Sequence, residues 1–180
     1  KNREDGKLKI FHLGSRDWKP NLEALSWLLD EIWPKIQKKI PNAELHLAGK
    51  NMPDWLFKKK NLNVFNHSEV KDSSKFISDH DVMLVPLLSA GGIRIKIIEG
   101  MAQGKAVIST KIGAEGIKYK NQENILIADS SKEFYNEALK IYSRETNFNK
   151  IGENAREHIL QTYDQNKISK KLVSFFESVS

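Results

Sequence analysis

The 180-residue sequence contains no cysteine. This absence excludes disulfide bonds, thiolate metal centres and cysteine nucleophiles, and it fits a reducing cytoplasm. The sequence also lacks an apolar run near the roughly 20 residues that a membrane-spanning helix needs. Residues 1–6 are polar, carry no signal-peptide pattern and do not begin with methionine, so we expect a cytoplasmic chain that is a fragment of a longer protein.

Patterns for two common kinds of enzyme centre are also missing. No Ser-His-Asp order or nucleophile elbow occurs, and no cluster of His, Asp and Glu has the spacing of metal ligands. We therefore predict no metal site and no cofactor. His12 and His46 lie inside expected strands and are interpreted as packed side chains, whereas His158 is expected on the surface.

Positive charge exceeds negative charge, with a formal net charge of +6. Much of it lies in Lys35, Lys38, Lys39 and a lysine run at 58–60, which are interpreted as solvated faces, with an anionic membrane surface as the alternative partner. Nucleic acid is not expected as a partner, because no basic stripe is interleaved with aromatic residues and no finger or RNP motif is present.

Short apolar segments alternate with helical patterns along the whole chain. This alternation predicts an α/β fold, a doubly wound parallel sheet of about six strands, in one domain spanning residues 1–180. The expected strands are Lys9–Leu13, Glu44–Ala48, Leu62–Phe65, Asp81–Val85, Ala106–Ser109 and Asn124–Ala128. The expected helices are one from about Asn21 that Pro34 kinks or divides, Met52–Lys59, Asp72–Ser78, one after Gly92, one capped by Ser130 or Ser131, Asn149–Tyr163 and Gln165–Val179.

The stretch from Val82 to Gly116 contains the clearest candidate site. The glycine-containing loop Ser89–Gly92 follows a strand, and a second such loop, Gly113–Gly116, follows the next strand. Such loops allow backbone to approach a ligand closely at the carboxyl edge of the sheet.

The helix between these loops is expected to begin just after Gly92 and to end with a left-handed cap at Gly104. Its buried face is predicted from the spacing of Ile95, Ile98 and Ala102. Free amides at its start favour an anion, and cations follow closely in the sequence, so a phosphate-bearing ligand is indicated.

Two separated motifs resemble those of a known family. The string PLLSAGGIRIKIIEGMAQGKAVISTKIGAEGI resembles the donor-binding signature of group 1, family 4-like glycosyltransferases, and FHLGSRDWKPNLEAL is similar to a Gly-Ser-x-Asp-Trp-x-Pro-Asn turn in the same branch. The resemblance implies a Rossmann-like, C-terminal half of a GT-B enzyme. It also implies a retaining transferase of the hexosyltransferase type that moves a sugar from a nucleotide diphosphate-sugar to a glycan or lipid-linked acceptor, in polysaccharide biosynthesis and without metal. The acceptor domain would precede this chain, which would be inactive alone.

The resemblance also implies roles for residues around the first glycine loop. Glu99 corresponds to the carboxylate that binds the donor ribose; an exposed pair with Lys96 is the alternative reading. The family's preceding Glu falls at Gly91, which puts the identity of the sugar in doubt. The amides of Gly92 and Ile93 remain available to the sugar or diphosphate.

Gly14, which ends the first strand, is expected to contact the donor. Counted from Gly14, the family's diphosphate-binding Arg and Lys fall at Ser15 and Pro20 here. We therefore expect Arg94 and Lys96 to act as the catalytic cations that neutralise the leaving diphosphate. They would be joined by a cation from the first loop, Arg16 or Lys19.

Two further positions complete the expected donor site. Ser68 follows the third strand, where family members contact the nucleobase through backbone, although glycine is usual there. Glu115 either reaches a donor hydroxyl or caps the next turn. A non-catalytic nucleotide-binding module and a sugar-nucleotide epimerase of the same architecture remain as alternatives, and the nucleotide, sugar and acceptor stay undetermined.

Overall fold

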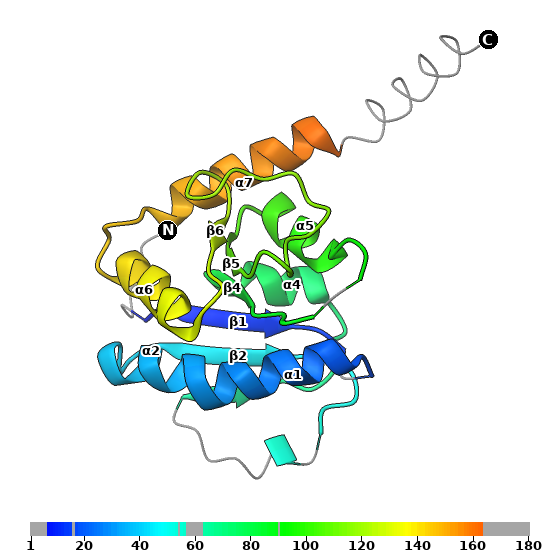
Figure 1. Ribbon diagram of the computed structural model, residues 1–180, viewed down its shortest axis with the longest axis vertical. Helices are drawn as coiled ribbons and strands as arrows, with labels where there is room; N and C mark the ends of the chain where they lie inside the picture. The colour runs from blue at the N-terminus through cyan, green and yellow to red at the C-terminus, as the bar shows by residue number, and fades with distance from the viewer. Residues whose placement is uncertain (1–6, 16, 54, 57–62, 90, 164–180) are drawn as a thin grey trace, which may run out of the picture.

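The computed structural model describes residues 7–15, 17–53, 55–56, 63–89 and 91–163. Its centre is a six-stranded, all-parallel sheet with the strand order β3-β2-β1-β4-β5-β6, which confirms the doubly wound α/β prediction (Figure 1). The strands are β1 (Lys9–Leu13), β2 (Glu44–Ala48), β3 (Val64–Asn66), β4 (Val82–Val85), β5 (Ala106–Ser109) and β6 (Leu126–Ile127).

Helices cover both faces of this sheet. They are α1 (Lys19–Trp27), the π-helical turn η1 (Leu28–Ile32), α2 (Trp33–Lys39), α4 (Ser73–Ser78), α5 (Ile95–Ala102), α6 (Ser131–Tyr142) and α7 (Phe148–Thr162). Alternate strand residues point to opposite faces, so Ile10 packs with α1, α2 and α6, whereas Phe11 packs with α4, α5 and α7. Two apolar cores therefore sandwich the sheet.

The predicted helix from about Asn21 is divided near Pro34, as expected from the sequence. The turn η1 continues directly into α2, and Pro34 lies at this junction, where it has no N–H with which to continue the α-helical hydrogen bonds. The amide of Trp33 bonds to the carbonyl of Leu28, five residues back, as in a π-helix. Of the predicted inward face, Leu25, Leu29, Ile32 and Ile36 are buried, and Leu22 is half-buried.

The last predicted strand is shorter than expected. Only Leu126 and Ile127 pair in β6, whereas the prediction ran from Asn124 to Ala128. The side chain of Asn124 accepts a hydrogen bond from the amide of Lys120 at 2.8 Å and stabilises a turn at this point. Local side-chain bonding of this kind competes with strand pairing.

The predicted start of α5 was too early, and its predicted buried face was correct only in part, because Ile98 and Ala102 pack against the core whereas Ile95 does not. The helix begins at Ile95 with Arg94 at its N-cap, and Ile95 is 67% exposed. Ile98 and Ala102 are half-buried.

The buried residues of α5 are Ile97, Gly100 and Met101. A Cβ on Gly100 would lie 2.9 Å from Sδ of Met83, so glycine lets the helix backbone lie directly on β4. The helical period was correct, but its phase was set by this close contact, which an apolar count does not register.

The ends of several elements agree with the sequence. Gly104 has φ +72°, as a left-handed cap requires, and Ser130 forms a capping box with Glu133. Within the predicted helix Met52–Lys59, Trp55 and Leu56 are helical and the rest is incompletely described. The predicted helix Gln165–Val179 lies outside the described residues, in which no helix is long and apolar enough to cross a membrane.

Candidate functional site

The loops after β1 and β2 meet at the carboxyl edge of the sheet, toward which the strand arrows point in Figure 1. The amide of Gly14 donates to the carbonyl of Ala48 at 3.0 Å. A Cβ on Gly49 would overlap the carbonyl oxygen of Gly14. Glycine is needed here because the two backbones are in direct contact.

Helix α5 is connected to the loop after β1 through the side chain of Asn21. Lys96 Nζ donates to Asn21 Oδ1 at 3.0 Å, and Asn21 Nδ2 donates to the carbonyl of Ser15 at 2.6 Å. A Cβ on Gly14 would lie 2.8 Å from Lys96 Nζ. The structure thus places the ammonium group of Lys96 directly beside the Gly14 loop.

Arg94 is folded against the protein at the start of α5. It is 6% exposed, its guanidinium carbon lies 4.9 Å from the ring centre of Trp18, and Nη2 donates to the carbonyl of Gly92. Its Nε is buried without a hydrogen-bond partner, and no carboxylate of the described residues forms an ion pair with it. The side chain therefore brings an uncompensated positive charge and a spare donor to the edge of the glycine loop.

The two glycine loops of the central stretch also touch. A Cβ on Gly116, which has φ +78°, would lie 2.9 Å from Cγ1 of Ile93. Thr110 Oγ1 accepts from the amide of Gly113 at 2.9 Å and donates to the carbonyl of Leu87 at 2.6 Å. These bonds connect the loops after β4 and β5, so a ligand at one loop lies near the other.

The carboxylates proposed to contact the donor lie on the surface. Glu99 and Glu115 are both exposed. The alternative pair between Glu99 and Lys96 is not formed, because no ion pair of Glu99 occurs in the described part of the chain. Gly91 is exposed, and a Cβ there would meet no atom within 4 Å.

The loop after β3 adopts the backbone conformation that glycine usually provides. Ser68 has φ +52°, its amide donates to Asn66 Oδ1 at 3.0 Å, and its carbonyl accepts from Gly49 at 2.8 Å. Next to this loop is a cavity of about 240 Å³, lined by Leu13, Gly14, Ser15, Gly49, Lys50, Glu69, Val70 and Ser73. Ser68 thus adopts the left-handed conformation expected of glycine at this position, and this conformation places the backbone beside the cavity.

The two cations expected in the loop after β1, Arg16 and Lys19, are not shown beside the glycine loops. Arg16 lies outside the described residues. Lys19 has a side chain that is 86% exposed and lies 3.8 Å from Glu23 Oε1. The other carboxylate oxygen of Glu23 accepts from Ser89 Oγ at 3.1 Å, so this pair connects α1 to the loop after β4.

Sequence reasoning missed three side chains that build the site. Trp18 and Asn21 were within the quoted turn motif but were given no role, although they contact Arg94 and Lys96. Asp17 accepts hydrogen bonds from Asn51 at 2.6 Å and Ser15 at 2.9 Å, which lower the pKa of its carboxyl. The polar residues of that motif were the available signal.

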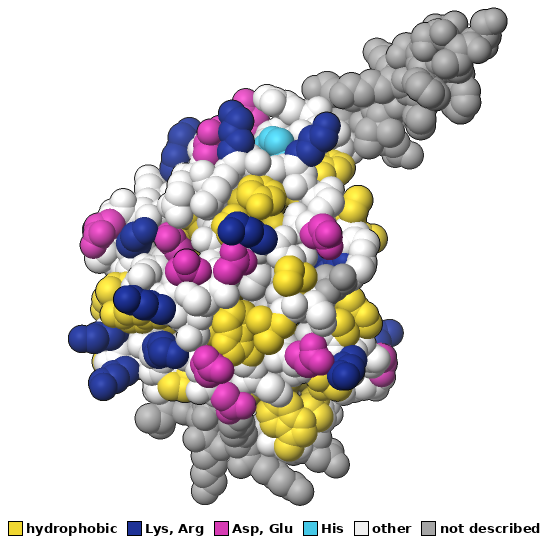
Figure 2. Space-filling model, viewed as in Figure 1, with side chains coloured by type: hydrophobic (Ala, Val, Ile, Leu, Met, Phe, Trp, Pro, Cys, Tyr) yellow, Lys and Arg dark blue, Asp and Glu magenta, His cyan; other side chains and the backbone are white. Residues whose placement is uncertain are grey.

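Of the lysines expected on solvated faces, Lys35, Lys38 and Lys39 lie in a separate cluster, whereas the run at 58–60 lies outside the described residues. Figure 2 shows Lys and Arg side chains gathered at the left edge, over α2 and α6, away from the carboxyl edge. Lys35, Lys38, Lys39 and Lys132, with Tyr135, line a hollow of about 320 Å³ there. This charge does not contribute to the loops described above.

Residues 7–144 match the family model described as "Glycosyl transferases group 1". A curated relative, an uncharacterized 44.6 kDa protein in the cps region of Klebsiella pneumoniae, is 24% identical over 169 residues, which cover 88% of this chain and 43% of the relative. The chain thus spans less than half the length of that relative.

Solved structures agree in fold. Anabaena HepE in complex with UDP-glucose matches with a TM-score of 0.72 and 15% identity over 96% of this chain and 49% of its own. The C-terminal domain of LpcC, a group 1 glycosyl transferase family protein from Francisella tularensis, matches with a TM-score of 0.68 and 20% identity over 88% and 87% of the two chains. The motif loops, the parallel sheet and the family match lead to one conclusion: the chain belongs to the group 1 glycosyltransferases and has the fold of one half of a GT-B enzyme.

Proposed function

We propose that this chain is the donor-binding domain of a retaining glycosyltransferase, which moves a sugar from a nucleotide diphosphate-sugar to a glycan or lipid-linked acceptor. The proposal rests chiefly on one observation. Lys96 and Arg94, at the start of α5, flank the glycine loops after β1 and β4, and Arg94 has no carboxylate partner in the described structure.

This arrangement suits a diphosphate. Cations held in place by neighbouring groups stabilise the charge that develops on a leaving phosphate without reorganising during the reaction. Asn21 positions Lys96, and the ring of Trp18 positions Arg94. In this proposal the two cations do the work that a metal ion does in other transferases, so the reaction needs no metal.

The remaining parts of the donor fit around this charge. The nucleobase would occupy the cavity beside Ser68, where backbone is close to the surface. Glu99 is exposed one turn into α5 and would accept hydrogen bonds from the ribose hydroxyls. Gly92, Ile93 and Glu115 would face the sugar and its phosphates. The complex of HepE with UDP-glucose favours uracil as the base.

The acceptor site is proposed to lie in a partner domain outside this chain. The chain covers 43% of the Klebsiella pneumoniae relative and 49% of HepE. GT-B enzymes close a cleft between two halves, so we expect the isolated chain to bind donor but to transfer no sugar. The lysine cluster on α2 and α6 would face an anionic membrane that carries a lipid-linked acceptor.

Calorimetric titration of the 180-residue chain with UDP, GDP and ADP, in EDTA and then in Mg²⁺, tests the proposal. We expect UDP to bind most tightly, with equal affinity under both conditions, and Glu99→Ala to weaken binding. Glu157→Ala, on α7, is a matched control that removes one exposed helical carboxylate elsewhere. Binding that requires Mg²⁺, or that is equally affected by both variants, would contradict the proposal.

A further inference from the structure

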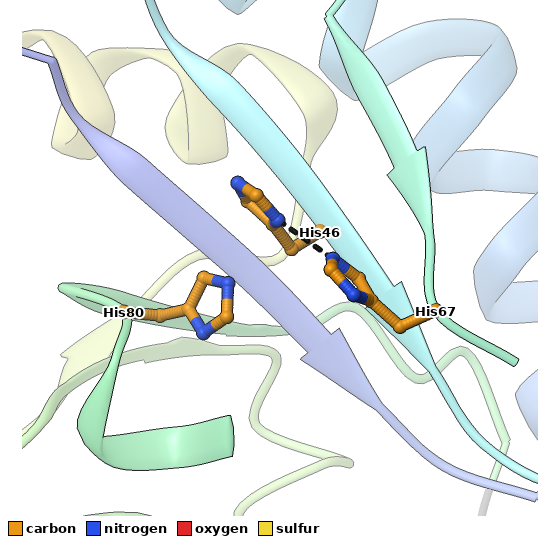
Figure 3. Close-up of side chains that lie close together, drawn as sticks. All are labelled: His46, His67 and His80. Atoms are coloured by element: carbon orange, nitrogen blue, oxygen red, sulfur yellow. Dashed lines mark hydrogen bonds between the residues drawn. The ribbon is translucent and has the colours of Figure 1, made fainter. Parts of the chain in front are cut away.

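Three of the five histidines meet on one side of the sheet, apart from the glycine loops. His46 lies in β2, His67 follows β3 and His80 lies between α4 and β4. One nitrogen of each ring lies within 4.8 Å of the others. Figure 3 shows the three rings turned toward a common region, with a hydrogen bond between His46 and His67.

The hydrogen bonds of His46 assign its tautomer. Its Nε2 lies 3.3 Å from Glu44 Oε2, and its Nδ1 lies 2.9 Å from His67 Nε2. Lys7 Nζ donates to Glu44 Oε1 at 2.7 Å, so this carboxylate is paired with a cation. A carboxylate only accepts hydrogen bonds, so His46 carries its proton on Nε2 and keeps the lone pair on Nδ1, inside the cluster.

His80 is oriented by the same logic. Its Nδ1 lies 2.6 Å from the carbonyl oxygen of Phe76, which again only accepts. The proton therefore belongs on Nδ1, and the lone pair on Nε2. His46 and His80 are each more than nine-tenths buried, so the carboxylate and the carbonyl hold both rings in one orientation.

The third ring can adjust. His67 is exposed and donates from Nε2 to the lone pair of His46 in the present arrangement. Moving its proton to Nδ1, where water can accept it, leaves a second lone pair directed at His46.

We propose that His46, His67 and His80 form a binding site for a divalent transition-metal ion of the zinc class. A tetrahedral zinc ion with bonds of about 2.0–2.1 Å separates its nitrogen ligands by roughly 3.3–3.4 Å. This spacing falls between the 2.9 Å of the His46–His67 pair and the 4.8 Å limit of the cluster.

The surroundings match those of protein metal sites. Ligand histidines usually donate their second N–H to a carboxylate or a backbone carbonyl, as His46 does to Glu44 and His80 to Phe76. Aromatic rings pack against the cluster: the ring centre of Phe65, which is exposed, lies 4.9 Å from that of His46, and the ring centre of buried Phe76 lies 4.4 Å from that of His80. The exposed ring of His67 leaves a route of entry and a fourth position for water.

The sequence did not indicate this site, because its ligands come from three elements with no short motif spacing. Its occupation would fasten the edge strand β3 to β2 and to the α4–β4 turn. His67 precedes Ser68, whose carbonyl is bonded to Gly49 at the proposed nucleobase cavity. The ion would thus act as a structural clamp next to that cavity.

Zinc titration of the 180-residue chain by calorimetry, in non-coordinating buffer near neutral pH, tests the site. We expect one zinc ion per chain, a higher melting temperature, and visible absorption typical of tetrahedral coordination when Co²⁺ replaces zinc. His67→Ala, an exposed position that should leave the fold intact, should weaken zinc binding by more than about 100-fold. Glu44→Gln should weaken it by about 10- to 100-fold, as loss of an orienting carboxylate does.

His158→Ala is the matched control, because it removes a histidine of α7 outside the cluster and should leave zinc affinity unchanged. Failure of the chain to bind zinc, or equal losses in His67→Ala and His158→Ala, would overturn the proposal. Nucleotide binding measured in EDTA is independent of this result, so either proposal can fail without the other.

Discussion

Asn21 shows how much of the site depends on a single polar side chain. It is 5% exposed and forms hydrogen bonds with both Lys96 and the carbonyl of Ser15. Lys96 is 75 residues away in the sequence. The sequence placed a helix start near this asparagine, but nothing local to it indicates a distant lysine. The contact arises only in the folded chain, where the start of α1 and the start of α5 meet at the carboxyl edge of the sheet.

Replacing Asn21 with alanine should destabilise the protein by about 1–3 kcal/mol, because the part-buried carbonyl of Ser15 and the part-buried ammonium group of Lys96 each lose a hydrogen bond. Urea unfolding of the 180-residue chain measures this difference. Lys19→Ala removes only an exposed ion pair at 3.8 Å and should change the stability by less than about 0.5 kcal/mol. Equal stability of Asn21→Ala and the unchanged chain would show that the connection is not structurally important.

The neighbouring glycines Gly91 and Gly92, in the loop after β4, have different conformations. Gly92 has φ +76°, whereas Gly91 has no positive φ and open space around its Cα. We expect Gly92→Ala to cost about 1–2 kcal/mol, the usual penalty of a left-handed conformation for alanine. Gly91→Ala should stay within about 0.5 kcal/mol of the unchanged chain. Thermal unfolding of the two variants compares them directly, and a larger loss for Gly91→Ala would contradict the loop geometry.

Among the elements, α5 shows what periodicity can and cannot predict. Its existence and its glycine cap were predictable, because apolar spacing and Gly104 depend on local chemistry. Its phase was not, because Gly100 takes the position of a buried side chain and lets backbone lie on Met83. Gly100, in the interior of the helix, therefore marked the face that contacts β4, although glycine has a low intrinsic helix propensity.

The start of α6 yields a prediction on pH. A hydrogen bond from the amide of Asp129, then one with Ser130, lowers the pKa of Glu133 from its ordinary 4.5. Because the folded pKa is depressed, the stabilisation from this carboxylate is fully present above 4.5 and is lost as the pH falls through the folded pKa. Glu133→Gln keeps an acceptor oxygen and removes the charge.

Urea midpoints of the unchanged chain and Glu133→Gln at about pH 7 and about pH 3 provide the measurement. The unchanged chain should be the more stable at the higher pH, and the difference should shrink at the lower one. A difference that grows on acidification would contradict the assigned sign. Lys132→Gln, next to it in α6, controls for a surface charge outside the capping box.

At the scale of the whole molecule, the sheet was predictable because parallel strands with two buried faces produce recurrent apolar runs. The meeting of the glycine loops was predictable in outline, since carboxyl ends of parallel strands share one edge. The histidine cluster was not, because His46, His67 and His80 approach only when the strand order places β2 between β3 and β1. Side-chain orientations, such as Arg94 on Trp18, depend on that same packing.

The proposal for the whole molecule is that two cations at the start of α5 bind the diphosphate of a sugar donor. Arg94→Gln tests it most directly, because it removes the guanidinium charge beside Trp18 and Gly92 and leaves an unbranched polar side chain at the same position. Lys150→Gln on α7 removes one positive charge elsewhere and is the control.

The measurement is the dissociation constant of UDP for these two variants and the unchanged chain, by calorimetry in EDTA, with uridine as the ligand that lacks phosphate. A hydrogen bond to a charged group contributes about 1.5–3 kcal/mol, which corresponds to roughly 10- to 100-fold in affinity. We predict that Arg94→Gln weakens UDP binding by that factor, leaves uridine binding unchanged, and differs from Lys150→Gln. Unaltered UDP affinity in a folded Arg94→Gln variant would contradict the account.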